Sequence, residues 1–155
     1  TDLLCRPLQP GGRYLDACAG LGGKTCALAQ SLPEKAVLYA VEPDRRRNRL
    51  LQENLVRQQL LDLVTPVCSD LQSFADTKPA PFDGILLDAP CSGTGVIRRH
   101  PDIRWNRTAA EIHTCRELQL RLLRTAAPLL APGGFLVYAT CSLEPEENEQ
   151  VIETF

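Results

Sequence analysis

Apolar segments alternate with amphipathic segments along this chain. Five runs are mainly apolar and close on polar or acidic residues: 13–18, 36–43, 63–70, 82–90 and 131–142. Between them, three segments have the spacing of helices with one apolar side: 24–32, 44–60 and 108–126. Nearly continuous apolar strands that alternate with helices are typical of a parallel sheet covered on both faces. The pattern therefore predicts an α/β fold with a doubly wound, Rossmann-like sheet.

Local signals refine the second half of the chain. Thr108 and Glu111 have the spacing of a capping box, which predicts that a helix begins there. Its expected apolar side is formed by Ile112, Cys115, Leu118, Leu122 and Ala126. A Pro-Gly-Gly turn precedes the fifth strand, and Pro145 with Glu146 and Glu147 suits the first turn of a last helix. The long segment 91–107 has no such pattern, and loops of that length are usually functional.

Residues with useful chemistry follow the predicted strands. In doubly wound sheets, ligands bind beyond the carboxyl ends of the strands. The residues at those ends are Asp16, Glu42, Asp70, Asp88 with Cys91, and Cys141. The sequence therefore predicts a site at one edge of the sheet.

A glycine-rich turn follows the first strand, in the segment YLDACAGLGGKTCALAQ. A phosphate-binding P-loop requires glycine where this chain has Cys18, although Gly23, Lys24 and Thr25 match its end. The dinucleotide fingerprint fits Gly20 and Gly22 but requires glycine at Thr25. Both templates fail by one residue, and a nucleoside-type cofactor without phosphates is the third possibility.

Two acids suit such a cofactor. Glu42 lies about twenty residues after the turn, where an acidic residue can accept two hydrogen bonds from a ribose diol. Asp70 is a candidate for holding an adenine amino group.

Two cysteines lie near strand ends. In LLDAPCSGTG, Asp88 comes three residues before Cys91, which can place acid–base chemistry beside a nucleophile. In ATCSLEPEEN, Cys141 precedes a predicted helix N-terminus, which favours a thiolate. Adjacent parallel strands would bring both thiols to one cleft. Cys18 is expected only to pack, and four other cysteines are interpreted as structural: Cys5, Cys26, Cys68 and Cys115.

Composition limits the class of protein. At 155 residues, with 44% hydrophobic and 23% charged residues, the chain predicts one ordinary globular domain. None of the seven cysteines has Cys-x-x-Cys spacing, so we expect reduced thiols and no metal site. No apolar run is long enough to cross a membrane, and no signal peptide opens the chain. We therefore expect a cytoplasmic location and no membrane contact.

The net charge of −2 argues against a strongly basic nucleic-acid binder. Basic residues are nevertheless concentrated with Trp105 in one segment, as Arg98, Arg99, Arg104 and Arg107. Arginines beside an aromatic residue suit phosphate contact and base stacking. The alternative is a solvated loop with one anchoring tryptophan.

Three segments carry a family resemblance: DACAGLGGKT, DAPCSGTGVIRRHPDIRW and ATCSLEPEENE. They resemble the Sun/Nop2 (NSUN) family of S-adenosylmethionine-dependent RNA cytosine-C5 methyltransferases, and within it the bacterial enzymes that act on 16S ribosomal RNA. The resemblance covers nearly the whole chain. It implies a Rossmann-like methyltransferase sheet, S-adenosylmethionine as cofactor and RNA as partner. We also expect a monomer.

The resemblance also implies a role for each motif residue. The turn would wrap the methionine end of the cofactor with Cys18, Ala19, Gly20, Leu21, Gly22, Gly23 and Lys24. Glu42 would bind the ribose, Arg47 matches an arginine of the family, and Asp70 would face the adenine. Asp88 would lie between cofactor and target base. Cys141 would be the nucleophile that adds to C6 of cytosine, and Cys91 would assist product release.

Some features depart from the family pattern. Leu21 replaces the usual proline of the turn, which is expected to loosen it. The missing initial methionine and the final residues predict a fragment, without the family's N-terminal RNA-binding region and C-terminal strands.

Three further interpretations stay open. Cys91 could be the nucleophile, as in DNA cytosine methyltransferases, but their Glu-Asn-Val signature is absent. The chain could be a non-catalytic protein that only binds cofactor or helps to assemble a ribosomal particle. It could also bind a nicotinamide cofactor or a nucleotide phosphate, although the imperfect glycine motifs weaken that interpretation.

Overall fold

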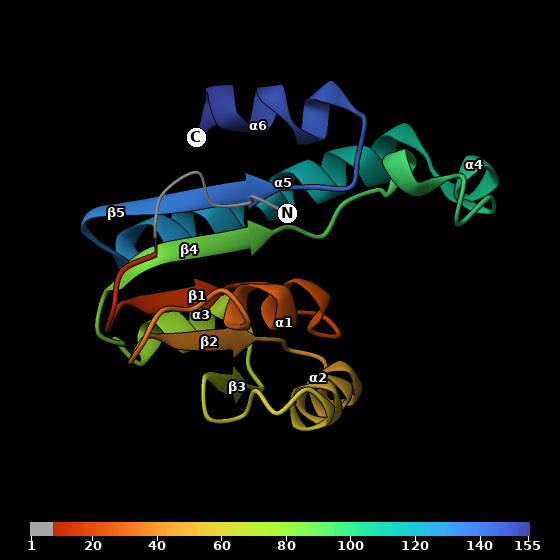
Figure 1. The fold of residues 1–155 in the computed structure, drawn as a ribbon. Helices are drawn as coiled ribbons and strands as arrows, with labels where there is room; N and C mark the ends of the chain where they lie inside the picture. The colour runs from red at the N-terminus through yellow and green to blue at the C-terminus, as the bar shows by residue number, and fades with distance from the viewer. Residues whose placement is uncertain (1–7) are drawn as a thin grey trace.

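A five-stranded sheet forms the centre of the computed structural model, which describes residues 8–155 (Figure 1). The strands are β1 (Arg13–Asp16), β2 (Val37–Val41), β3 (Val64–Val67), β4 (Phe82–Asp88) and β5 (Leu130–Ala139). They lie in the order β3-β2-β1-β4-β5, and all neighbouring pairs are parallel. This order confirms the prediction of a doubly wound, Rossmann-like α/β sheet.

Helices connect the strands and cover both faces of the sheet. The α-helices are α1 (Gly23–Ala29), α2 (Arg45–Arg57), α3 (Leu71–Asp76), α4 (Ile103–Asn106), α5 (Ala109–Ala126) and α6 (Glu149–Thr154). The 3-10 helices are η1 (Thr94–Val96), η2 (Ala127–Leu129) and η3 (Pro145–Glu147). The last helix, α6, lies beyond the edge strand β5 and contacts α5 (Figure 1).

Two apolar cores hold these layers together. On one face, Leu51 and Leu55 of α2 pack with Leu38 of β2 and with α1. On the other face, Phe74 of α3 and Leu123 of α5 pack against the strands. Burial of each large side chain stabilises the fold by roughly 1.5–3 kcal/mol, so these contacts fix where the strand ends lie.

Polar side chains begin the helices that follow the strands. Asp44 accepts a hydrogen bond from the Arg47 backbone (2.7 Å) and caps α2. The predicted capping box is confirmed, since Thr108 and Glu111 exchange both of its hydrogen bonds at the start of α5. These caps satisfy N–H groups that have no partner inside the helix.

Several details differ from the sequence prediction. The helix α3 was not predicted, and neither were η1 and α4 within segment 91–107. Each has six residues or fewer, which is too short for a helical period to be recognised. The predicted Pro-Gly-Gly turn lies within β5, as an irregularity in its pairing with β4.

The buried side of α5 also differs from the prediction. Leu120, Leu123 and Ala126 are buried there. Leu118 and Leu122, which were expected in the core, are only partly buried. Leu122 still packs against the core, and both residues line the cavity described below.

The cysteines of the described residues are all free. Cys26 is buried as expected and Cys115 is half-buried, whereas Cys68 is exposed; Cys5 lies outside the described residues. Residues 8–155 contain no cluster of three or more potential metal ligands. Within the same range, every helix is too short or too polar to cross a bilayer.

Candidate active site

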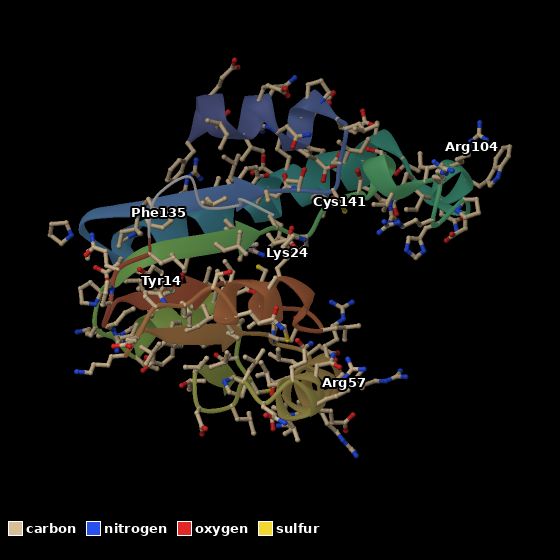
Figure 2. All side chains as sticks on the ribbon, viewed as in Figure 1. Tyr14, Lys24, Arg57, Arg104, Phe135 and Cys141 are labelled. Carbon is tan, nitrogen blue, oxygen red and sulfur yellow. The ribbon has the colours of Figure 1, made fainter. Side chains whose placement is uncertain are left out.

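A cavity of about 690 Å³ opens at the carboxyl ends of β1, β2, β4 and β5. Nine residues predicted for the site line it: Cys18, Gly20, Lys24, Glu42, Arg47, Asp70, Asp88, Cys91 and Cys141. Lys24 and Cys141 lie at this end of the sheet, whereas Tyr14 and Phe135 lie toward the opposite end (Figure 2). The expectation that these residues meet at one sheet edge is thus met.

The glycine-rich turn shapes one wall of the cavity. Gly20 and Gly22 have positive φ angles of 55° and 87°, a left-handed conformation that glycine adopts without strain. The backbone N–H of Gly22 donates to the Ala19 carbonyl (2.9 Å) and closes the turn. Leu21 lies at its exposed tip, and Asn54 of α2 donates to the Leu21 carbonyl (2.9 Å). The turn is therefore anchored despite the missing proline.

Four predicted cofactor residues of this turn do not line the cavity: Ala19, Leu21, Gly22 and Gly23. Ala19 is buried in the core, and Gly22 and Gly23 begin α1. These four residues support the neighbouring residues that do line the cavity. Direct contact between the four residues and a cofactor stays a prediction.

Asp16, at the end of β1, holds the turn in place through hydrogen bonds. It is fully buried and accepts hydrogen bonds from Thr25 Oγ1 (2.7 Å) and from the Cys18 backbone (3.4 Å). Burial raises the pKa of Asp16 to about 6, although both hydrogen bonds act in the opposite direction. Burial likewise raises the pKa of Cys18 to about 12, with Asp16 and Glu42 adding to the effect. Cys18 is therefore a packing residue and a poor source of thiolate.

Glu42 lies at the base of the cavity with only 4% of its surface exposed. Its Oε1 accepts a hydrogen bond from the Asp44 backbone (2.9 Å). Among the described residues no donor reaches Oε2. Because Glu42 lines the cavity and a carboxylate oxygen accepts hydrogen bonds, Glu42 is well suited to receive a hydroxyl group from a ligand.

Asp70 and Arg47 occupy the outer part of the cavity. Asp70 is exposed and caps α3, accepting from the backbone (2.9 Å) and the hydroxyl (2.7 Å) of Ser73. These hydrogen bonds lower the pKa of Asp70. Because both carboxylate oxygens already have donors, an adenine contact by Asp70 stays a prediction. Arg47 is exposed in the first turn of α2.

Lys24 and Asp88 form an ion pair across the cavity, which sequence analysis did not foresee. Lys24 Nζ lies 2.5 Å from Asp88 Oδ2, and both side chains are partly exposed. Such a pair adds at most about 1 kcal/mol of stability. Its main consequence is geometric, since it holds the Asp88 carboxylate at the wall of the cavity that the two cysteines also line.

The two cysteines are in direct contact, although 50 residues separate them in the chain. Their sulfur atoms are 2.8 Å apart, and the Cys141 backbone N–H points at Cys91 Sγ (3.2 Å). Burial raises the pKa of Cys91 to about 12, and its hydrogen bond with the Cys141 side chain adds to the effect. Cys91 is therefore a neutral thiol at physiological pH in this arrangement.

A buried polar cluster behind these cysteines was not predicted from the sequence. Glu147 was expected in the first turn of a helix; its side chain is fully buried and contacts Ser92 and Gln119. The helical pattern gives no signal for this burial, since the turn containing Glu147 is a 3-10 helix. Its neighbour Glu146 is exposed.

Segment 91–107 is tied to the site at both ends. The Gly95 backbone donates to the Cys141 carbonyl (2.9 Å), and Arg107 Nε donates to the Ser92 carbonyl (2.7 Å). Between these anchors, α4 projects beyond the sheet (Figure 1), and Arg104 points outward from it (Figure 2). Trp105 is 86% exposed, so the interpretation of an anchoring tryptophan was wrong.

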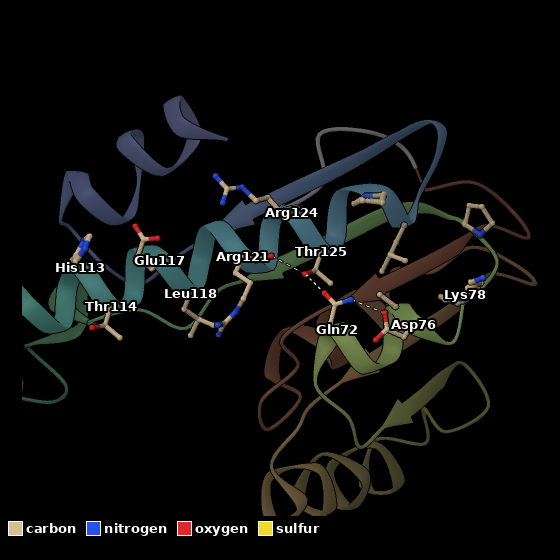
Figure 3. A pocket seen from close by; sticks show the side chains of 15 residues that line it. Gln72, Asp76, Lys78, His113, Thr114, Glu117, Leu118, Arg121, Arg124 and Thr125 are labelled. Atoms are coloured by element: carbon tan, nitrogen blue, oxygen red, sulfur yellow. Dashed lines mark hydrogen bonds between the residues drawn. The ribbon is translucent and has the colours of Figure 1, made fainter.

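A larger groove of about 1120 Å³ lies between α3 and α5 (Figure 3). Thr125 of α5 donates to Gln72 of α3 (3.1 Å), and this hydrogen bond joins the two helices at the groove (Figure 3). The groove adjoins the cavity and shares four lining residues with it: Gln72, Leu118, Arg121 and Thr125. None of the predicted site residues lines this groove, so its size does not make it the reaction site.

Comparison with known proteins shows the family to which the chain belongs. The sequence model described as 16S rRNA methyltransferase RsmB/F matches residues 4–155. Proteins named ribosomal RNA small subunit methyltransferase B are 48% identical in Pseudomonas putida and 45% identical in Yersinia pestis, over 100% and 95% of this chain. The chain belongs to the RsmB/F family of 16S rRNA methyltransferases, which confirms the Sun/Nop2 resemblance.

Solved structures agree in fold. A methyltransferase homologue from Pyrococcus horikoshii is 42% identical, with a TM-score of 0.82 over 96% of this chain and 45% of its own. NSun6 from the same organism, solved with SFG, is 34% identical, with a TM-score of 0.83 over 92% of this chain and 36% of its own. The chain spans about a third of the length of the curated relatives, 35% and 34% of the two named above.

The raised pKa of Asp16 predicts a pH effect on stability. Its folded pKa of about 6 exceeds the ordinary value of 3.8, so the folded state holds this proton more tightly than the unfolded chain does. Its contribution to stability is thus complete below pH 4 and is lost as pH rises toward 6. Between pH 4 and pH 7, the free energy of unfolding should fall by roughly 2–3 kcal/mol more in the parent than in Asp16→Asn.

Urea denaturation at several pH values measures this difference. The variant Asp62→Asn, at an exposed aspartate, is the control and should follow the parent. The same pH dependence in parent and Asp16→Asn would contradict a buried, titrating Asp16.

Proposed function

We propose that this chain is the catalytic domain of an enzyme that transfers a methyl group from S-adenosylmethionine to C5 of a cytosine in 16S ribosomal RNA. One observation carries the proposal: two thiols from different strands meet at the cavity, beside Asp88. A single nucleophile would need only one of them. Two adjacent thiols suit a reaction that forms a covalent bond to a base and must then break it.

The cavity suits S-adenosylmethionine better than a nucleotide phosphate. Its volume of about 690 Å³ is in the usual range for small-molecule sites. In a P-loop the lysine would reach phosphates, but here Lys24 is paired with Asp88. Glu42 has an oxygen free for the ribose diol, and Leu118 and Leu122 offer an apolar wall. A solved relative, NSun6, contains SFG, an analogue of this cofactor, which supports the assignment.

The residues of the chain account for the steps around methyl transfer. S-adenosylmethionine, when bound, supplies an electrophilic methyl group. The Cys141 thiolate adds to C6 of the cytosine, which makes C5 electron-rich enough to take that methyl group. Asp88 in its acid form donates its proton to N3 as negative charge develops there, and takes the proton back when the ring is restored. Loss of the C5 proton to a base then expels Cys141 and restores the aromatic ring.

The two thiols have different roles in this scheme. Cys91 has a pKa near 12 and is a weak nucleophile at neutral pH, which favours Cys141 for the attack. Cys91 lies 2.8 Å from the Cys141 sulfur, so it is within reach of the bond that must break. We therefore assign the attack to Cys141 and assistance in product release to Cys91.

The segment 98–107, which contains α4, has side chains that suit binding to RNA. Four arginines and one aspartate lie within residues 98–107, in a chain whose net charge is −2. Exposed Trp105 offers a flat apolar surface on which an unstacked base can lie. The target cytosine must leave its helix or loop to enter the cavity, and neighbouring bases then require a new support.

Trapping the covalent intermediate tests the assignment of the thiols. In the full-length protein, Cys91→Ala should accumulate an RNA–protein adduct that survives denaturing electrophoresis, because the adduct forms but is not released. Cys141→Ala should form no adduct. The exposed cysteine variant Cys68→Ala is the control and should turn over like the parent. Adduct in Cys141→Ala but not in Cys91→Ala would make Cys91 the nucleophile.

The stacking role of Trp105 is tested by RNA affinity. Trp105→Ala in the full-length protein should weaken binding of unmodified RNA by roughly 5- to 100-fold, because one base loses its stacking surface. Trp105→Phe should keep most of the affinity, and S-adenosylmethionine binding should not change.

Leu61→Ala is a matched control, since Leu61 is also exposed and apolar but lies just before β3, at the other edge of the sheet. Fluorescence anisotropy with labelled RNA measures the effect. Unchanged RNA affinity in Trp105→Ala would contradict this role. So would a loss of thermal stability without a loss of RNA affinity.

A further inference from the structure

Glu147 is a buried carboxylate surrounded by neutral donors. Its side chain is fully buried, and the described residues include no lysine or arginine that pairs with it. Oε1 accepts from the Ser92 backbone (2.9 Å) and from Gln119 Nε2 (2.9 Å), and Oε2 accepts from the Ser92 hydroxyl. Burial raises the pKa of Glu147, but hydrogen bonds from Ser142 and Ser92 outweigh burial and lower it. The group therefore remains charged.

These hydrogen bonds hold the backbone on both sides of Cys91. Gln119, which contacts Glu147, also donates to the Pro90 carbonyl (2.9 Å). Ser92 is held by Glu147 at its N–H and hydroxyl and by Arg107 at its carbonyl (2.7 Å). The peptide units before and after Cys91 are thus fixed, and the thiol between them has little freedom to move.

Asn148, the next residue, holds the loop that contains Cys141 through hydrogen bonds. Asn148 Oδ1 accepts from the Thr140 hydroxyl (2.7 Å), and Nδ2 donates to the Ser142 carbonyl (3.1 Å). The hydroxyls of Ser92 and Ser142 also contact each other (3.2 Å). Consecutive residues of the η3–α6 junction therefore hold the two cysteine loops, which come from different strands.

We propose that Glu147 is a positioning residue that holds the Cys91 thiol against Cys141 through Ser92 and Gln119. The inference rests on the proposed function, because it assigns Glu147 to the product-release step that Cys91 assists. A carboxylate suits this place because it only accepts hydrogen bonds, and every neighbour donates. An amide at this position would turn N–H groups toward one of those donors.

Glu147→Gln in the full-length protein tests this role, with Glu146→Gln as the matched control at the exposed neighbouring residue. We expect the rate of adduct formation in a single turnover to change less than threefold. Multiple turnover should fall roughly 10- to 100-fold because Cys91 is misplaced, with KM for RNA unchanged. The RNA–protein adduct should accumulate in Glu147→Gln, as in Cys91→Ala, and not in Glu146→Gln.

Ser92→Ala provides a second variant that removes only a hydroxyl group. If Glu147 acts through Ser92, the double variant should be no slower than the slower single variant, because both changes break one connection. Should Glu147→Gln fail to fold, adduct accumulation in Ser92→Ala carries the same test.

Two results would overturn the inference. One is turnover in Glu147→Gln equal to that of Glu146→Gln. The other is a parallel loss of thermal stability, cofactor affinity and adduct formation, which would make Glu147 merely structural. If Cys91→Ala itself accumulates no adduct, the proposed function fails. If Cys91→Ala accumulates adduct and neither Glu147→Gln nor Ser92→Ala does, only the positioning role fails.

Discussion

The parallel pairing of β4 with β5 is the constraint on which the site depends. Their register places Asp88 opposite Ala139, and the Ala89 N–H donates to the Ala139 carbonyl (2.8 Å) where the strands end. Both loops therefore leave the sheet at the same level and in the same direction. Two cysteines 50 residues apart can then touch without any distortion of the strands. A shift of register by one residue would turn the side chains to the opposite face and separate them.

The sheet and its chemically active edge could be predicted from sequence because they depend on strong, repeated signals. Apolar strands closed by Asp16 and Asp88 indicated the strand ends, and the glycine turn indicated the first wall of the cavity. Other features depend on tertiary contacts that no local pattern encodes. The pairing of Lys24 with Asp88 joins residues 64 positions apart. The burial of Glu147 depends on a loop from another strand, and α3 is too short to show a helical period.

The proposed function divides the cavity between cofactor and base. Glu42, Leu118 and Leu122 line the cavity and are assigned to the nucleoside cofactor. Asp88 and the two cysteines line the same cavity and are assigned to the base. The groove between α3 and α5 has the larger volume, but no cysteine is among the described residues that line it (Figure 3). We therefore base the proposed reaction site on the convergence of acids and thiols and not on volume.

The central claim is that the cavity holds S-adenosylmethionine, and calorimetric titration tests it most directly. The full-length protein should bind S-adenosylmethionine at one site, with no heat from NAD or ATP. Glu42→Ala should weaken this binding, because the buried carboxylate would no longer receive the ribose hydroxyls. Binding of NAD or ATP in its place, or no binding of S-adenosylmethionine, would contradict the account.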